Sequence, residues 1–449
     1  MSKKLPIVAI IGQTNAGKSA IFNRIVGSQD AIVAREAGTT RDNVVRTVDG
    51  PKPFILVDTA GLKAPEDDFE ATIQDQIDDA ITSSDVILLV KDRTEVATQS
   101  DREIAKKALK SKKPVILALN KSDLKDQLPV SEFLRLGVRE IYETSAEHNR
   151  GFKQLLQAIT SQIETVKPIK EEVNNSIKIA LIGRPNVGKS HLFNSLAGKQ
   201  QAIVANVAGT TRDINRVKIK YHNQNIELLD TAGVRKKGKI EQGIEKFSIL
   251  RTVSAIEEAD ICLLLMDVNE LNTGVDQALA GMISEAGKGM IIVVSKWDSV
   301  EDKDAFTRDA LAPKIAHAFD FVPWAPLIFT SSVTGQNVTK IFDLATEITK
   351  RRKQQITTRR LNDMLGHAVA SHPPAGLKNT HPKFRYMVQT DVNPPWFVIY
   401  GSNFKFIHWS YKRYLERKMR EAFDFAGTPI KFSFRDEKQI KANKKISPA

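Results

Sequence analysis

Two stretches of this chain have the spacing of a phosphate-binding loop, Gly-x-x-x-x-Gly-Lys-Ser. They occupy residues 12–19 and 183–190. In such a loop the glycines allow backbone N–H groups to surround a polyphosphate, the lysine contacts the outer phosphates, and the serine hydroxyl binds Mg²⁺. The chemistry expected at both places is therefore the binding of a nucleoside triphosphate with Mg²⁺.

The residues that follow each loop are also repeated. Gly-Thr-Thr-Arg-Asp stands at 38–42 and 209–213, and Asp-Thr-Ala-Gly stands at 58–61 and 230–233. The loops and the Gly-Thr-Thr-Arg-Asp runs are each separated by 171 positions (183 − 12 and 209 − 38). This repetition indicates a duplication, and it predicts two tandem nucleotide-switch domains.

Buried strands must position these loops. The apolar runs at 86–90, 115–119 and 261–266 have the length of buried parallel strands, and they alternate with amphipathic stretches. The pattern predicts an α/β fold with two tandem P-loop G domains, each a mostly parallel sheet with helices on both faces. We place the first G domain at 4–166, a polar linker at 167–175 and the second G domain at 176–350.

A third, smaller α/β domain is expected at 351–436, followed by a basic tail at 437–449 that we expect to be disordered. Its pattern predicts a helix at 358–370, strands at 384–389 and 396–400, a helix at 411–425 and a last strand at 430–435. The second helix carries five cations along its length: Lys412, Arg413, Arg417, Lys418 and Arg420.

The excess positive charge lies entirely in this last part of the chain. The whole chain has a net charge of +13, and residues 351–449 contain 20 Lys+Arg against 7 Asp+Glu. The rest of the chain is therefore neutral on balance. Such concentration favours a polyanionic partner, and a small α/β unit with a basic helix suits single-stranded or structured RNA.

A base-recognition element distinguishes among nucleotides. In Asn120-Lys121-Ser122-Asp123 the aspartate can accept two hydrogen bonds from guanine, a donor pair that adenine lacks. The backbone at Ser145 and Ala146 would meet the guanine carbonyl oxygen. In the second repeat Asp298 keeps the guanine contact, with Ser331 and Ser332 on the base side. Ser295 replaces the asparagine there, and since its side chain is shorter we expect it not to span the same distance, which would weaken binding without changing specificity.

The switch segments complete the expected machinery. Asp58 and Asp230 would hold Mg²⁺ through water, and Gly61 and Gly233 would each donate an N–H to the γ-phosphate. Thr40 and Thr211, or the threonines directly before them, would close over Mg²⁺ and the γ-phosphate when GTP is bound.

Hydrolysis is expected to be slow without assistance. Leu62 and Val234 stand where some GTPases have a glutamine that orients water. Asn15 and Asn186 would ligate a monovalent cation beside the phosphates and so supply positive charge where negative charge develops.

The expected site residues fall into three overlapping groups. Those expected to bind GTP are Gly12, Asn15, Ala16, Gly17, Lys18, Ser19, Ala20, Asp58, Gly61, Asn120, Lys121, Asp123, Ser145 and Ala146, and in the second repeat Gly183, Asn186, Val187, Gly188, Lys189, Ser190, His191, Asp230, Gly233, Ser295, Lys296, Asp298, Ser331 and Ser332. Those expected to hold Mg²⁺ are Ser19, Thr40, Asp58, Ser190, Thr211 and Asp230. Those expected to act in catalysis are Lys18, Lys189, Asn15, Asn186, Thr40 and Thr211.

With these motifs the chain resembles the EngA (Der) family of bacterial ribosome-assembly GTPases over nearly its whole length. The resemblance rests on Gly-Thr-Thr-Arg-Asp in both halves, Val-Arg-Lys-Lys-Gly-Lys at 234–239, His-Pro-Pro at 372–374 and Asn-Pro-Pro at 393–395. It implies a KH-like third domain without the usual Gly-x-x-Gly loop, a role in maturation of the large ribosomal subunit, contact with ribosomal RNA, and K⁺ activation through Asn15 and Asn186. The chain departs from the family pattern at Gln13, Ala20, His191 and Ser295, where we expect effects on relative rates and affinities.

Composition limits the alternatives. The only cysteine is Cys262, so a disulfide framework and a cysteine metal site are excluded, and a reducing cytoplasm is expected. No apolar run approaches the roughly 20 residues of a membrane span, so we expect no integral membrane association. We expect a monomer. Two other classes of protein remain as alternatives. One is a GTP-gated interaction protein with one inactive site, which would bind another polyanion or a membrane surface. The other, less favoured, is a small-molecule kinase.

Overall fold

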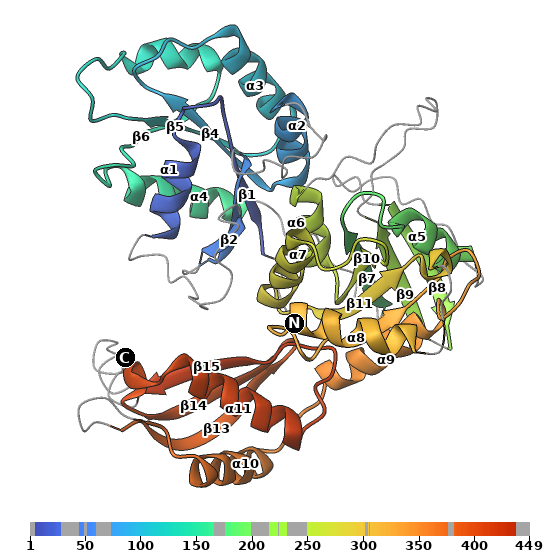
Figure 1. Ribbon diagram of the computed structural model, residues 1–449. Helices are drawn as coiled ribbons and strands as arrows, with labels where there is room; N and C mark the ends of the chain where they lie inside the picture. The colour runs from blue at the N-terminus through green and yellow to red at the C-terminus, as the bar shows by residue number, and fades with distance from the viewer. Residues whose placement is uncertain are drawn as a thin grey trace.

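The computed structural model of the chain consists of three α/β units (Figure 1). It describes residues 5–27, 45–48, 52–59, 73–165, 176–198, 215–222, 224–230, 249–300, 304, 306–375 and 381–436. The linker predicted at 167–175 and the tail predicted at 437–449 lie outside these residues.

The strands and helices follow the order expected from the apolar runs. The strands are β1 (Ile7–Ile11), β2 (Val45–Val48), β3 (Phe54–Asp58), β4 (Val86–Asp92), β5 (Val115–Asn120), β6 (Glu140–Glu143), β7 (Ser176–Gly183), β8 (Asn215–Tyr221), β9 (Gln224–Asp230), β10 (Ile261–Asp267), β11 (Gly289–Ser295), β12 (Leu327–Phe329), β13 (Lys383–Val392), β14 (Pro395–Ser402) and β15 (Lys431–Asp436). The helices are α1 (Lys18–Val26), α2 (Ile73–Ser83), α3 (Gln99–Lys110), α4 (Phe152–Thr165), α5 (Lys189–Gly198), α6 (Ile249–Glu258), α7 (Gly274–Glu285), α8 (Thr307–Ala318), α9 (Lys340–Arg352), α10 (Thr358–Ser371) and α11 (Trp409–Ala422).

The first two units share one topology. Their sheets run β2-β3-β1-β4-β5-β6 and β12-β11-β10-β7-β9-β8, which is the same order read in opposite directions. Every pairing is parallel except β2 with β3 and β8 with β9. The predicted mostly parallel sheets are therefore confirmed, and parallel strands bring their carboxyl ends, and the loops that follow them, to one edge of each sheet.

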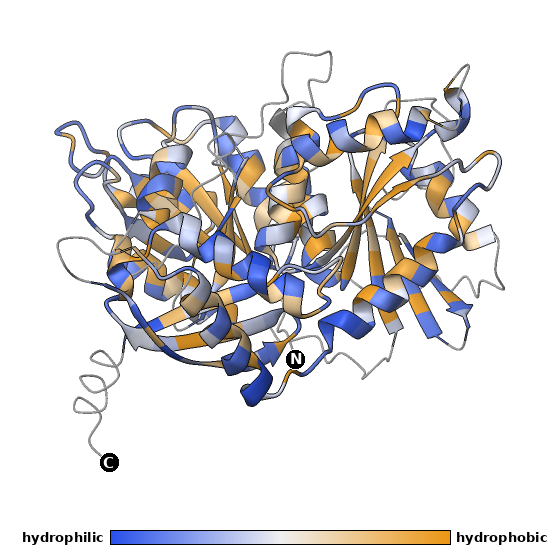
Figure 2. Ribbon diagram, turned by 60° about the horizontal axis from the view of Figure 1, so that its bottom comes forward, coloured by the Kyte–Doolittle hydropathy of each residue, from blue (hydrophilic) through white to orange (hydrophobic). Residues whose placement is uncertain are grey.

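Helices cover both faces of each sheet, because the central strands are apolar on both faces. In β1, Ile7, Ala9 and Ile11 pack with α2 and α3, whereas Val8 and Ile10 pack with α1 and α4. Figure 2 shows the apolar strands enclosed by helices whose outer surfaces are polar.

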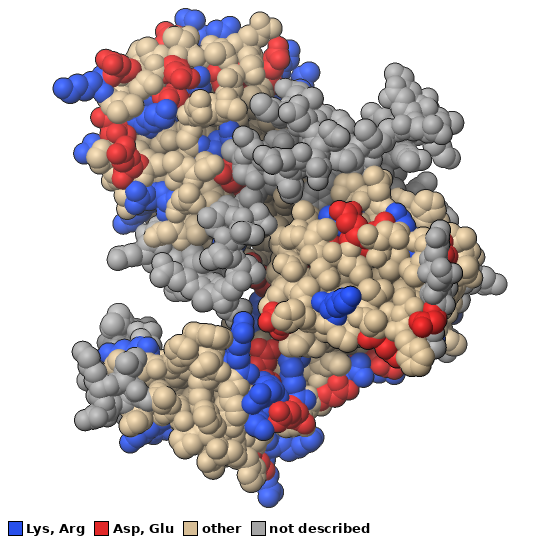
Figure 3. Space-filling model, in the orientation of Figure 1, with Lys and Arg blue, Asp and Glu red and all other residues tan. Residues whose placement is uncertain are grey.

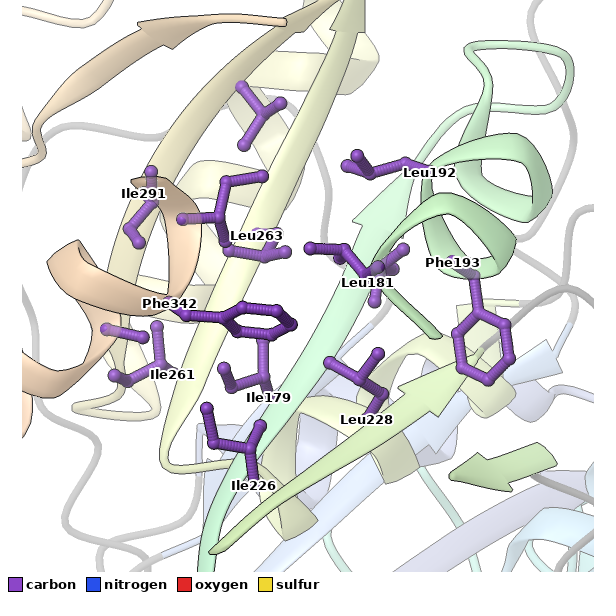
Figure 4. Packing of buried hydrophobic residues seen from close by; sticks show 14 of the residues in the cluster. Ile179, Leu181, Leu192, Phe193, Ile226, Leu228, Ile261, Leu263, Ile291 and Phe342 are labelled. Carbon is purple, nitrogen blue, oxygen red and sulfur yellow. The ribbon is translucent and has the colours of Figure 1, made fainter. Parts of the chain in front are cut away.

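The second unit repeats this packing. One cluster lies between the sheet and helices α5 and α9, where Phe342 of α9 lies among Ile179, Ile261 and Leu263 of the strands (Figure 4). Burying each such side chain contributes roughly 1.5–3 kcal/mol, so the sheet is a rigid base for the loops at its edge.

The third unit is a three-stranded sheet of order β13-β14-β15 with α10 and α11 on one face. The order of elements confirms the predicted helix, strand, strand, helix, strand. The basic helix begins at Trp409 and ends at Ala422, slightly earlier at both ends than predicted.

The first two units meet through α2 and α6, the helices that follow the two Asp-Thr-Ala-Gly segments. Leu250 and Val253 of α6 belong to the same apolar cluster as Ile77 and Ala80 of α2. The guanidinium of Arg251 also lies 2.5 Å from a carboxylate oxygen of Asp79.

Arg352 joins the second and third units. Its side chain is 3% exposed, and it donates to the backbone oxygen of Gly287 at 2.9 Å, to the Thr428 hydroxyl at 2.9 Å and to the side-chain oxygen of Asn393. Burial lowers the pKa of Arg352 to about 10, so the guanidinium remains protonated at neutral pH and keeps its donors.

Candidate nucleotide-binding sites

Each predicted phosphate loop connects the first strand of its sheet to the helix that follows. The first loop joins β1 to α1 and the second joins β7 to α5. Asn15 and Asn186 occupy the same left-handed conformation, with φ of 66° and 61°. The two loops therefore share a backbone path that turns sharply into a helix N-terminus, a place that favours anions.

The glycines of the first loop are required by close approach as well as by conformation. Gly12 has φ +147°, and a Cβ there would lie 2.3 Å from the backbone oxygen of Val90. Gly17 has φ +86°, and a Cβ there would lie 2.1 Å from the amide nitrogen of Asn120. Contacts this short would displace the loop or the strand end beside it.

The predicted phosphate lysines are held by their own loops. Lys18 Nζ donates to the backbone oxygens of Gly12 at 3.0 Å and Gln13 at 2.6 Å, and Lys189 Nζ donates to that of Arg184 at 2.6 Å. Burial lowers the pKa of Lys18, and the charge of Asp58 opposes that change. An ammonium held in this way is oriented before any phosphate arrives, which reduces the entropy lost on binding.

The second residue of each loop contacts the cap of a neighbouring helix. Thr98 caps α3 and Thr273 caps α7, each in a capping box with an aspartate three residues later. Gln13 donates to the Thr98 hydroxyl at 2.8 Å, and Arg184 donates to Asp276, the aspartate of the α7 box, at 3.1 Å. Gln13, one of the departures from the family pattern, therefore keeps the corresponding contact.

The predicted Mg²⁺ aspartates lie beside these loops. Asp58 ends β3 and is 2% exposed, and Asp230 ends β9 and is 5% exposed. Asp58 is in register with Ile10 of β1, just before the loop. The buried carboxylate of Asp58, which lies close enough to Lys18 to affect its pKa, and the exposed hydroxyl of the adjoining Ser19 are the hard oxygen donors that Mg²⁺ prefers, so these residues fit the ion.

Asn120 connects the two halves of the first site. Its amide nitrogen donates to the backbone oxygen of Ala16 in the phosphate loop at 3.3 Å, and its amide oxygen accepts from the backbone N–H of Ala146 at 3.2 Å. One buried side chain thus fixes the distance between the phosphate loop and the predicted base loop.

Ser295 reaches the phosphate loop but does not span the distance that Asn120 spans in the first site. Its hydroxyl lies 2.5 Å from the backbone oxygen of Val187 in the phosphate loop, although the side chain is shorter than asparagine. It reaches because the loop lies close to the end of β11. A Cβ on Gly188 would lie 3.7 Å from the Ser295 hydroxyl, whereas a Cβ on Gly17 would lie 2.1 Å from the Asn120 amide nitrogen. The serine therefore leaves space beside the second phosphate loop that the asparagine fills beside the first. Among the described residues, Ser295 makes no hydrogen bond to Ser332, so only the phosphate-loop half of the bridge is kept.

The guanine-recognition aspartates are oriented by the serines of the base loops. The Ser331 hydroxyl donates to Asp298 at 2.5 Å, and the corresponding hydrogen bond from Ser145 is the main reason that the pKa of Asp123 is lowered. The hydrogen bond therefore keeps Asp123 ionised, and able to act as a double acceptor, to lower pH than an aspartate without it.

A second pair of aspartates was not found from the sequence. Asp92 ends β4 and lies 2.5 Å from Lys121 Nζ, and Asp267 ends β10 and lies 2.7 Å from Lys296 Nζ. Burial alone would raise the pKa of both carboxyls, but the hydrogen bonds from the lysines and neighbouring backbone lower them. Each aspartate precedes its lysine by 29 residues, and comparing the two repeats at that spacing would have found the pair.

The structure therefore gathers the described site residues at the carboxyl edge of each sheet. Thr40, Thr211, Gly61, Gly233, Leu62 and Val234 lie outside the described residues. Within the described part of the chain, no helix has both the length and the apolar character needed to cross a membrane.

Comparison with known proteins finds families, relatives and a solved structure to which this chain is similar. The family described as "50S ribosome-binding GTPase" matches residues 7–121 and 178–296, and the "KH-domain-like of EngA bacterial GTPase enzymes, C-terminal" family matches residues 355–435. The chain is 42% identical to GTPase Der of Herpetosiphon aurantiacus, over 97% of this chain and 98% of that protein. It is 40% identical to GTPase Der of Chloroflexus aggregans, over 97% and 98%. Among solved structures, it is similar to the G domain of the Thermotoga maritima FeoB iron transporter, at 29% identity over 38% of this chain and 98% of that chain, with a TM-score of 0.27.

Proposed function

Because this chain belongs to the Der family of GTPases, we propose that it uses GTP hydrolysis at two sites to control its binding to ribosomal RNA during assembly of the large (50S) ribosomal subunit. The observation that carries the proposal is one chain with two phosphate-loop sites of the same design and a basic KH-like unit, which contacts the second unit through Arg352. We also propose that the protein acts in the cytoplasm as a monomer, with unit boundaries at 4–166, 176–350 and 351–436.

At each site, the described residues divide the work of binding GTP. Lys18 and Lys189 contact the outer phosphates, and Asp123 and Asp298 accept the two guanine hydrogen bonds. Ser19 with Asp58, and Ser190 with Asp230, hold Mg²⁺, which when bound neutralises phosphate charge. Support comes from the location of these residues at one edge of each sheet.

Hydrolysis depends on charge stabilisation at the phosphates. Lys18 and Lys189 are already oriented by their own loops, so they meet the developing charge with little reorganisation. Asn15 and Asn186 lie in left-handed turns of those loops, and we assign to them the monovalent cation, K⁺. Turnover should then be faster in KCl than in NaCl, and Asn15→Ala and Asn186→Ala should each reduce that difference.

The alternative with one inactive site has less support. The second site keeps the lysine, the buried aspartate, the guanine aspartate and a hydrogen bond between strand end and phosphate loop. Lys18→Ala and Lys189→Ala test this, because an inactive site would leave turnover unchanged when its lysine is removed.

Co-sedimentation with purified 50S subunits tests the proposed function. The full chain is compared in GDP and in a non-hydrolysable GTP analogue, at two salt concentrations. We expect binding that depends on the nucleotide and weakens with salt. Binding that is equal in both nucleotide states, or absent in both, would refute the proposal.

A further inference from the structure

The sequence places five cations along α11, but these cations have different surroundings in the structure. Arg420 is turned inward, where it donates to the backbone oxygens of Phe425 and Thr428 and lies 5.7 Å over the ring of Trp324 in the second unit. Arg417 and Lys418 both pair with Glu421, at 3.7 and 2.7 Å. The second half of the helix is therefore occupied by its own contacts.

The first half of α11 has a different character. Lys412 and Arg413, together with Lys405 in the turn before the helix, are exposed, and none of the three forms an ion pair within the described part of the chain. No aspartate or glutamate occurs in the sequence between Asp391 and Glu416. Figure 3 shows more Lys and Arg than Asp and Glu side chains over this third unit, at the foot of the view.

An exposed aromatic side chain lies on the same half of the helix and contacts one of these cations. Trp409, the first residue of α11, is 53% exposed. The Arg413 guanidinium lies 4.9 Å from its ring centroid, one helical turn further on. A large apolar ring left in solvent costs free energy, and the guanidinium covers only part of it.

The surroundings hold this group in place. The backbone N–H of Phe404 donates to Asp436 at the end of β15, and Lys412 Nζ lies 5.3 Å over the ring of Phe434 in that strand. The His408 ring accepts from the backbone N–H of Ser410 at 3.3 Å and so caps the helix at Trp409. Lys412 therefore lies against the sheet, and Trp409 stands at the capped N-terminus of α11.

We propose that Trp409, with Lys405, Lys412 and Arg413, binds an unpaired base of RNA by stacking, while the cations contact the phosphates on either side. An exposed indole can stack only on a base that is not already stacked in a duplex, and flanking cations that form no ion pair among the described residues match a polyanionic strand. The inference rests on the proposed RNA-binding function and assigns to it one surface and one feature of the RNA.

The test compares four full-length proteins: the native chain, Trp409→Ala, Trp409→Phe and Arg417→Ala. Arg417→Ala is the matched control, because it removes a cation of the same helix that pairs with Glu421. Unfolding temperature and GTP turnover should be the same in all four, since none of these residues lies at a nucleotide site. The probe is a fluorescently labelled single-stranded RNA oligonucleotide, with the same sequence in a perfect duplex as the comparison.

We expect Trp409→Ala to weaken binding of the single strand by roughly 5- to 100-fold and to leave duplex binding nearly unchanged. Trp409→Phe should retain most of the affinity, and Arg417→Ala should change it less than about twofold. The inference would be overturned if Trp409→Ala bound the single strand as tightly as the native chain, or if it lost equal affinity for single strand and duplex. It would also be overturned if the native chain bound phosphatidylserine vesicles tightly and Trp409→Ala abolished that binding while RNA binding persisted.

The two proposals fail in different ways. If the native chain binds 50S subunits in a nucleotide-dependent way and Trp409→Ala binds them and the single strand equally well, only the assignment of this surface falls. If the native chain binds neither 50S subunits nor RNA in any nucleotide state, the proposed function falls, and this inference falls with it.

Discussion

Asn120 and Ser295 stand at equivalent strand ends but connect different numbers of loops, which leads to a quantitative prediction. Asn120 bonds both to the phosphate loop and to Ala146 of the base loop, whereas Ser295 bonds to the phosphate loop and not to Ser332 among the described residues. Asn120→Ser should therefore give the first site the connectivity of the second, and Asn120→Ala should remove both bonds.

The expected losses follow from the number of bonds. A hydrogen bond contributes a net ~1 kcal/mol, and leaving a buried group unsatisfied costs about 1–3 kcal/mol. Asn120→Ser loses the bond from Ala146, so GDP affinity at the first site should fall by about fivefold. Asn120→Ala also leaves the buried carbonyl of Ala16 without this donor, so affinity should fall by about 30-fold or more.

The assay is titration with a fluorescent GDP analogue. Each measurement is made in a Lys189→Ala background, so that the first site dominates the signal. Ser295→Ala in a Lys18→Ala background is the matched measurement on the second site, and it should cost about five- to tenfold through loss of the Val187 contact. Equal affinities for Asn120→Ser and Asn120→Ala, or no change in either, would refute the bridging argument.

Three further predictions concern other contacts. Arg352→Met should lower the unfolding free energy of the junction between the second and third units by roughly 3 kcal/mol or more, measured by hydrogen exchange, because it removes every donor of a buried guanidinium. Gly17→Ala should reduce nucleotide affinity more than Gly188→Ala, measured by calorimetry, because both positions have positive φ but only the first places a Cβ 2.1 Å from a side-chain amide. Ser145→Ala should move the acid limit of GDP binding to higher pH. Affinity that depends on the Asp123 carboxylate is present above the pKa of Asp123 and is lost as pH falls through it. The hydrogen bond from Ser145 lowers that pKa, so removing the hydroxyl raises it.

The sequence by itself determined the local parts of this protein. A phosphate loop is a short run whose function depends on its own backbone, so residues 12–19 and 183–190 were identifiable without a structure. The strands were equally predictable, because runs such as 86–90 are apolar on both faces and can only be buried in a parallel sheet. The duplication then predicted two sheets of the same topology, which the strand orders confirm.

The tertiary structure alone decided contacts between residues far apart in the chain. Side-chain length predicted that Ser295 would not span the same distance as asparagine, but its contact with the phosphate loop depends on how closely β11 approaches that loop. The sequence showed Arg420 only as one of five cations along a basic helix, whereas helix docking turned it into the junction with the second unit. Asp92 became a partner of Lys121 only because neighbouring parallel strands end at the same edge. Such contacts depend on register and packing, which are set by the whole core and not by any one segment.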